Sequence, residues 1–427
     1  MIPVSQDTEK TLSSRGSRRL LESIQKRLAF RMAELETGES LALLRRIRDE
    51  LLSEESLDSS MAAEFNATMA KLSEARLAHE LPPLYARLCD TSRRHFATRS
   101  SAGTFQEFLS TTLETLLITS CTIAVEHLRQ EGEPAPQGSW CLLAADSLGR
   151  MESTLGGQNC IILAHEESDA QSHQYFHRLA IRLMAILADC GIPTQPGLRG
   201  GGTIFWHGSI GNWREQLLDS IGPMVPGQSG GGGKFDPAMA TPYDRGIELI
   251  ADLRPIWGDK DLSDRVMEMS AAFLAWESQR EEFRQLARRV ATMPVALGMF
   301  GRFRTARSGS HRGQFSMEEM ATRPLVASVR MLAILSGIRE TSTAARIRAL
   351  LAGGGLGVAI ADRLLLALNE FVRCQIKLEI AHGGEGEEYF LNPDVLGHVS
   401  RERLKSGLED LTTLQRLLYQ QIAEVSQ

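Results

Sequence analysis

The stretch covering residues 145–163 constrains the fold of this chain more than any other part of it. It runs Ala-Asp-Ser-Leu-Gly-Arg-Met-Glu-Ser-Thr-Leu-Gly-Gly-Gln-Asn-Cys-Ile-Ile-Leu. Short continuous apolar runs at residues 140–145 and 160–165, bounded by glycines, predict two buried strands. A Ser-x-Gly-Arg turn and a short helical start separate them. The sequence therefore predicts a sheet near the middle of the chain.

The segments on either side of this sheet favour helix. No proline occurs between Pro3 and Pro82, where leucine, alanine, glutamate and arginine dominate, a composition typical of helices. A further helix is predicted over residues 104–130, and its stretch 116–125 is apolar enough to be buried against a neighbour. From about residue 276 onward the pattern is helical again.

The middle of the chain mixes helices and strands. Residues 131–138 form a linker rich in proline and glycine. Apolar residues at helical spacing predict a helix over residues 169–190, and the apolar run 247–253 predicts a third strand. We therefore predict an α+β fold with three parts. These are a helical N-terminal region (1–130), an α/β domain (131–275) and a helical C-terminal domain (276–427).

Composition excludes several classes of protein. The chain has 427 residues, 43% hydrophobic and 23% charged, which is ordinary for a globular protein of two or three domains. Its net charge of −6 argues against a general nucleic-acid binder, because such proteins are normally basic. The six cysteines include no C-x-x-C pair, which favours buried free thiols in a reducing compartment. No uncharged apolar run reaches the roughly 18 residues that a membrane span needs. We therefore expect a cytoplasmic protein that binds neither membrane nor nucleic acid.

The turn after residue 145 resembles the signature of the nucleotidyltransferase fold, Gly-Ser-x-Gly-Arg-x-Glu followed by an Asp-x-Asp strand. Ser147, Gly149, Arg150 and Glu152 match that signature, and Asp146 stands where it has its first glycine. In that fold the serine and neighbouring backbone N–H groups hold phosphate oxygens. The resemblance implies a mixed sheet flanked by helices and a nucleotide-binding role for the four matching residues.

This chain differs from the family at the two metal-binding positions of the signature. Its Asp-x-Asp strand points both carboxylates to one face, because residues two apart on a strand share a face, and they hold Mg²⁺ ions there. In this chain the two positions are Gln158 and Cys160. Glutamine offers only a neutral carbonyl, and cysteine is a soft ligand poorly suited to Mg²⁺.

A second segment narrows the resemblance. Residues 251–259, Ala-Asp-Leu-Arg-Pro-Ile-Trp-Gly-Asp, resemble the Asp-Leu-Arg-Pro-(x)2-Gly-Asp segment of nucleotidyltransferases related to PII-uridylyltransferase, which often accompany domains of signal transduction. Further similar segments run in the family's order, at Trp206, Trp213-Arg214, 294–301, 323–326, Arg330, Gly337-Ile338 and Asn392-Pro393. The resemblance implies that Asp252 is a remnant third catalytic carboxylate. A simple ion pair of Asp252 with Arg254 or Arg150 is the alternative.

Three other patterns carry weaker signals. The segment 227–234 is similar to a phosphate-binding loop, but its spacing is wrong, which favours a surface loop. His173 and His177 are four residues apart on the predicted helix, a spacing that can bind zinc. No third ligand is evident in the sequence, so a solvated helix face is favoured and no metal site is predicted. The basic run 302–312 is expected to be a solvated loop.

Two functions follow from the resemblance. The favoured one is a catalytically degenerate signalling protein, a pseudoenzyme that binds a nucleotide or a partner protein, for which the sequence indicates no particular cofactor. The other is an active uridylyltransferase-like enzyme, which would use Mg²⁺ and a nucleoside triphosphate to transfer a nucleotidyl group to a protein or small acceptor. The N-terminal helices are expected either to support self-association or partner docking, or to cover the core of their own monomer.

Overall fold

A computed structural model describes residues 58–157, 159–166, 169–192, 203–212, 242–298, 301–382 and 389–424. Gln158, Trp213, Arg214 and the segment 227–234 lie outside the described residues, as does the side chain of Trp206. The chain divides into two compact units, residues 1–70 and 71–427. Residues 58–70 of the first unit are helical, as predicted. The following description concerns the second unit.

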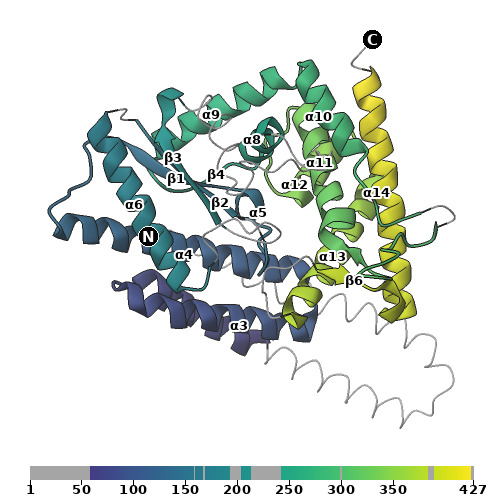
Figure 1. Ribbon diagram of the computed structural model, residues 1–427, viewed down its shortest axis with the longest axis horizontal. Coiled ribbons are helices and arrows are strands. Elements are labelled where there is room, and N and C mark those ends of the chain that lie inside the picture. The colour runs from purple at the N-terminus through teal and green to yellow at the C-terminus, as the bar shows by residue number, and fades with distance from the viewer. Residues whose placement is uncertain are drawn as a thin grey trace, which may run out of the picture. The chain divides into compact units, whose positions relative to one another are not determined.

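Two long helices precede the sheet, α3 (Leu81–Arg99) and α4 (Ala102–Gln130), and this confirms the predicted helix over 104–130. The Ser101 side chain caps α4 by accepting a hydrogen bond from the Thr104 N–H. By length and composition α4 could cross a membrane, but 61% of its apolar stretch is buried inside the protein. It packs against α3 and α6 (Ala170–Asp189) (Figure 1). Such burial is typical of the core helix of a globular domain.

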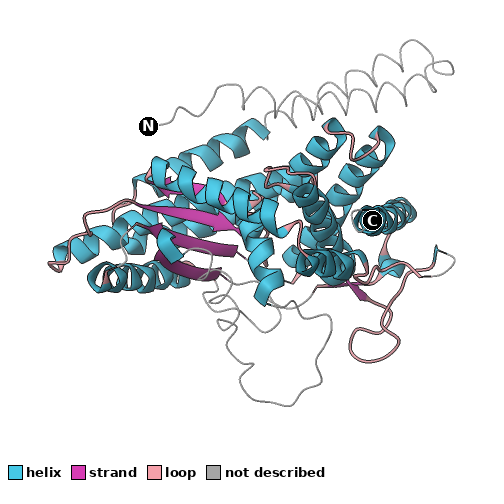
Figure 2. Cartoon of the chain, turned by 90° about the horizontal axis from the view of Figure 1, so that it is seen from above, coloured by secondary structure: helices cyan, strands magenta, loops and turns pink. Residues whose placement is uncertain are grey.

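The four-stranded sheet is mixed, with the strand order β3-β2-β1-β4. Its strands are β1 (Trp140–Ala145), β2 (Asn159–His165), β3 (Thr203–Ser209) and β4 (Arg254–Gly258). The pairs β1–β2 and β1–β4 are antiparallel, whereas β2 and β3 are parallel. Figure 2 shows the strands side by side with helices packed around them. The predicted α+β class and mixed sheet are confirmed.

The predicted strand over residues 247–253 is wrong. Residues 247–251 belong to the helix α8 (Pro242–Ala251), and β4 begins only at Arg254. A short apolar run cannot by itself distinguish a buried strand from one face of a buried helix. Here Ile247 and Ile250 face the core while Glu248 carries a charge between them. The helix α9 (Lys260–Glu277) follows β4 and is capped by the Asp259 side chain.

The C-terminal part is helical, as predicted, with α10 (Glu281–Ala291), α11 (Arg323–Leu335), α12 (Thr343–Ala352), α13 (Val358–Ala381) and α14 (His398–Glu424). A small antiparallel ribbon, not predicted, joins β5 (Phe315–Ser316) to β6 (Phe390–Leu391). Short helical turns complete the description: η1 (Ala78–Glu80), α5 (Asp146–Gly149), η2 (Ile210–Asn212), η4 (Glu318–Thr322) and η5 (Pro393–Val395).

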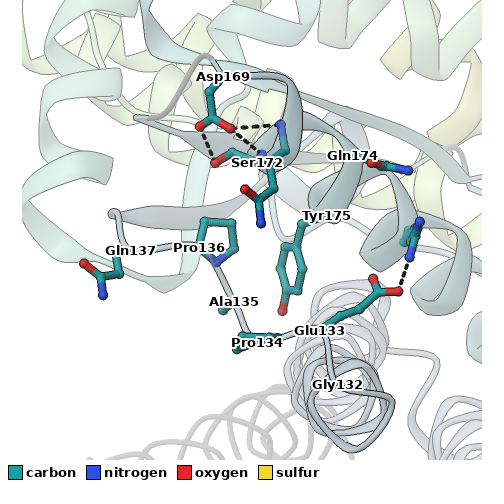
Figure 3. Close-up of a pocket in the computed structure, with 12 residues that line it drawn as sticks. Gly132, Glu133, Pro134, Ala135, Pro136, Gln137, Asp169, Ser172, Gln174 and Tyr175 are labelled. Carbon is teal, nitrogen blue, oxygen red and sulfur yellow. Dashed lines mark hydrogen bonds and ion pairs between the residues drawn. The ribbon is translucent and has the colours of Figure 1, made fainter.

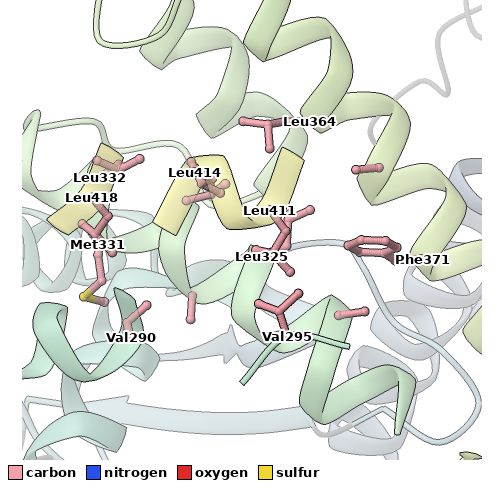
Figure 4. Close-up of a cluster of buried hydrophobic side chains, with 14 of the residues drawn as sticks. Val290, Val295, Leu325, Met331, Leu332, Leu364, Phe371, Leu411, Leu414 and Leu418 are labelled. Atoms are coloured by element: carbon pink, nitrogen blue, oxygen red, sulfur yellow. The ribbon is translucent and has the colours of Figure 1, made fainter. Parts of the chain in front are cut away.

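The helices of this part share one core, centred on α14 (Figure 4). Five leucines of α14 recur at helical spacing and are fully buried, at positions 404, 408, 411, 414 and 418. They meet α10, α11 and α13 through side chains such as Val290, Leu325 and Phe371. A side chain at Gly407 would come within 2.9 Å of Cε1 of Phe371, so this glycine allows α14 to approach α13 closely.

We predict that Leu411→Ala destabilises the protein by about 2–5 kcal/mol, because it leaves a cavity among well-packed helices. Leu366→Ala on α13 is the matched control, since Leu366 is 70% exposed and its loss should cost less than about 0.5 kcal/mol. Urea unfolding of both variants measures the difference. Equal stabilities would contradict the placement of α14 in the core.

Candidate functional site

The turn between β1 and β2 begins with an unusual backbone conformation at Asp146. Its φ angle is +58°, in the left-handed region that favours glycine and that Asp tolerates better than most residues. Asp146 therefore adopts a conformation that suits the glycine of the signature and adds a carboxylate. Arg245 of α8 pairs with that carboxylate through both of its terminal nitrogens, with Nη1 2.7 Å from Oδ1.

Gly149 is required by close packing. A Cβ at this position would lie 2.0 Å from the carbonyl oxygen of Asp252 and 2.9 Å from that of Ala144. The turn after β1 therefore rests directly on the residue that follows α8. The glycine of the signature serves the fold in this structure, whatever it contributes to ligand binding.

Ser147 is turned towards the protein. It is 8% exposed, and its hydroxyl donates a hydrogen bond of 3.1 Å to Oδ1 of Asn159 at the start of β2. The Ser153 hydroxyl also donates to this oxygen, at 3.5 Å. The side chain predicted to hold a phosphate is thus already bonded within the turn.

Asp252 lies at the centre of a buried cluster of arginines and is itself fully buried. Arg330 of α11 donates to both of its oxygens, at 3.1 and 2.7 Å. Arg346 of α12 donates to Oδ1 at 2.8 Å, and Arg150 donates to Oδ2. Of the two ion pairs considered from the sequence, the one with Arg150 is confirmed. The one with Arg254 is wrong, since Arg254 pairs with Glu114 of α4 at 2.7 Å.

The arginines set the charge of Asp252. Burial by itself would raise the pKa of this carboxyl, but Arg330, Arg150 and Arg346 outweigh burial and hold the pKa well below its usual range. Asp252 is therefore an ionised carboxylate whose oxygens accept hydrogen bonds from three guanidinium groups.

The cluster extends into a balanced network. Arg330 also meets Glu248 at 3.3 Å, and Glu248 lies 3.6 Å from Arg245. Arg150 meets Glu152 at 2.8 Å, and the Thr343 hydroxyl donates to Glu152 at 3.0 Å. The network joins four acids to four arginines: Asp146, Glu152, Glu248 and Asp252 with Arg150, Arg245, Arg330 and Arg346. Its members come from the turn, α8, the connection between α8 and β4 that holds Asp252, α11 and α12.

Sequence reasoning missed Arg245, Glu248 and Arg346. A usable signal existed for two of them. Arg245, Glu248 and Asp252 are spaced three and four residues apart, so they line one face of a helix. The incorrect prediction of a strand over residues 247–253 concealed this helical spacing.

Cys160 is a free cysteine. It is buried in the sheet, and burial, with a smaller contribution from Asp146, raises the pKa of its thiol far above the usual range. A metal ligand would have to be the thiolate. Among the described residues, no group of three or more His, Cys, Asp or Glu side chains is arranged to hold a metal ion as the side chains stand.

A second buried carboxyl holds the far end of the turn. The Thr154 hydroxyl and the Leu155 N–H donate to Glu379 of α13, at 2.7 and 3.0 Å. Burial raises the pKa of Glu379 to about 7 in spite of these hydrogen bonds, and nearby Glu318 adds to the rise. The C-terminal helices therefore contact the second half of the turn, with Thr343 at Glu152 and Glu379 at Thr154 and Leu155.

Two cavities lie near these elements. One of about 600 Å³ is lined by residues 132–137 and the first half of α6, with the Tyr175 side chain within it (Figure 3). None of its lining residues belongs to the Asp252 network. The other, of about 280 Å³, lies between α8, α9 and α11 and is bordered by Arg346.

Two family models match the chain. One, described as "Putative nucleotidyltransferase DUF294", matches residues 86–224, and the other, "Putative nucleotidyltransferase substrate binding domain", matches residues 280–422. Together they cover well over half of the sequence. The chain belongs to this nucleotidyltransferase family. No curated protein matches it.

The family matches show which parts the Asp252 network connects. Asp146, Arg150 and Glu152 lie within the nucleotidyltransferase match, whereas Arg330 and Arg346 lie within the substrate-binding match. Asp252 lies in the segment between the two matches. The network therefore ties the two family domains together through one buried carboxylate.

We predict that Asp252→Asn lowers the free energy of unfolding by about 3–5 kcal/mol, because it leaves buried guanidinium groups without their counter-charge. Because the pKa of Asp252 is depressed, this contribution is present above about pH 4 and is lost only as the pH falls further. Urea unfolding at pH 7 measures it. Asp264→Asn removes an exposed partner of Lys260 and should change stability by less than about 0.5 kcal/mol. Equal effects of the two variants would refute the structural role of Asp252.

Glu379 predicts a different pH dependence. Its pKa is about 7 in the folded protein and about 4.3 in an unfolded chain, so the folded state binds more protons between these values. Stability should therefore fall by about 3 kcal/mol as the pH rises through this window. Glu379→Gln should remove the fall, whereas Glu268→Gln on the surface should keep it. Urea unfolding at pH 5, 6.5 and 8 tests this, and parallel pH profiles for wild type and Glu379→Gln would disprove it.

Proposed function

We propose that this protein is a catalytically degenerate nucleotidyltransferase that acts by binding, with a partner protein as its favoured ligand. The observation that carries this proposal is the state of Asp252, which is fully buried and bonded to three arginines. A carboxylate that serves metal-dependent transfer must instead present its oxygens to a cation and a substrate.

Guanidinium groups supply the positive charge that metal ions would supply in an active site. Arg245 neutralises Asp146, and Arg330 lies between Glu248 and Asp252. Arginine remains protonated in proteins, so these guanidinium groups keep their positive charge at any ordinary pH. A metal ion would have to displace charges that are covalently attached to the chain. Cys160, at one of the two usual ligand positions, adds no negative charge that would favour this exchange.

The side chains predicted to bind a nucleotide also have hydrogen-bond partners within the protein. Ser147 is bonded to Asn159, and Arg150 to Asp252 and Glu152. A triphosphate would have to break these bonds, so we expect any nucleotide binding to be weak and nearly independent of metal. This favours a partner protein in a signalling role, as expected for a relative of PII-uridylyltransferase. We expect that partner to bind the domain described as substrate-binding. The cytoplasm is the expected compartment.

The alternative is an active enzyme that transfers a nucleotidyl group from a nucleoside triphosphate with Mg²⁺. Retention of Ser147, Gly149, Arg150, Glu152 and Asp252 favours it. It would require the arginines to release Asp252 when substrate binds. The two hypotheses therefore differ in whether Asp252 ever contacts a metal ion.

We predict that the full chain shows no Mg²⁺-dependent nucleotidyl transfer when it is incubated with labelled nucleoside triphosphates and host lysate. Calorimetry with each nucleotide should give weak binding that chelator leaves unchanged and Ser147→Ala weakens, with Ser278→Ala as a surface control. Transfer that needs Mg²⁺ and disappears in Asp252→Asn would establish the active enzyme instead. Tight nucleotide binding that chelator abolishes would also overturn the hypothesis of a catalytically degenerate protein.

A further inference from the structure

Three histidines gather at the edge of the sheet, away from the residues of the Asp252 network. His173 and His177 lie one turn apart on the exposed face of α6. His207 comes from β3, the edge strand, where it pairs in register with Leu163 of β2. The ring centroid of His207 lies 4.8 Å from that of His173 and 5.6 Å from that of His177.

These separations match a shared metal ion. In a tetrahedral zinc site with Zn–N bonds of about 2.0–2.1 Å, the centroids of two coordinated imidazole rings lie about 5 Å apart. A pair of histidines four residues apart on a helix is a common half of such a site, and here a strand supplies the third ring. The sequence could not reveal His207 as the third ligand, because only the packing of β3 against α6 brings it there.

The surroundings of His207 suit a ligand. Its Nδ1 is buried and has no hydrogen-bond partner among the described residues. A neutral imidazole nitrogen without a hydrogen-bond partner can coordinate a metal ion.

We propose that His173, His177 and His207 form a zinc-binding site that fastens the edge strand β3 to α6. As the side chains stand the three rings are not arranged around a common point. Because His173 and His177 are exposed, rotation about their side-chain bonds can bring their nitrogens to the ion at little cost. Three protein ligands leave the fourth coordination position to solvent.

The test uses the metal-free full chain titrated with Zn²⁺, and with Co²⁺ as a spectroscopic probe of the site. We expect one ion per chain, visible absorption of a four- or five-coordinate Co²⁺ complex, and a rise in the melting temperature with Zn²⁺. His207→Ala should weaken Zn²⁺ binding at least about tenfold, the lower limit of what even an outer-shell change costs a metal site. His207→Gln, which keeps a polar side chain of similar size, should do the same, and circular dichroism checks that both variants fold.

His398→Ala, at an exposed histidine on α14, is the matched control and should bind as the wild type does. Three outcomes would overturn the proposal. The wild type binds no Zn²⁺ at micromolar concentration, the folded His207 variants bind as tightly as the wild type, or His398→Ala weakens binding equally. The second result would reduce the site to the helical pair alone. None of these outcomes bears on the role of Asp252, so this inference stands or falls independently of the proposed function.

Discussion

The burial of one carboxylate, Asp252, among three arginines is the interaction on which the arrangement of this protein depends. Taking a carboxylate and three guanidinium groups out of water is expensive, and their attraction compensates only when every partner is present with good geometry. Such a cluster adds little net stability compared with an apolar core, but it tolerates very few arrangements. It therefore fixes how the turn, α8, α11 and α12 meet. Both domains recognised by the family models depend on the same contact.

The close packing of Gly149 in the turn is linked to the burial of Asp252. Because Gly149 lies directly against the carbonyl oxygen of Asp252, the turn can approach the end of α8 closely enough for Arg150 to reach the carboxylate. Glu379 then holds the other end of the turn through Thr154 and Leu155. The partners of Arg150, Thr154 and Leu155 lie 102, 225 and 224 positions away in the sequence. The turn's own sequence therefore does not specify the contacts that hold it.

The sequence predicted the elements whose signals are local. The strand β1 and the helices α4 and α6 were found because their apolar periodicity and flanking residues agree. It failed at α8, where a short apolar run left strand and helix indistinguishable, and this error concealed the face that carries Arg245 and Glu248. Arg346 could not be found at all, since it lies 94 positions from Asp252 and no local pattern marks it. The same reason hid His207, whose neighbours become evident only when β3 packs on α6.

Two departures from the family signature, Asp146 and Cys160, lie close together at the ends of β1 and β2. Asp146 carries a negative charge close enough to Cys160 to contribute to the raised pKa of its thiol, and Arg245 neutralises that charge. An aspartate in place of Cys160 would put a second buried carboxylate near Asp146. Nearby like charges in a buried site disfavour the ionisation of both groups, so the neutral thiol of Cys160 is compatible with the carboxylate of Asp146 and its partner Arg245.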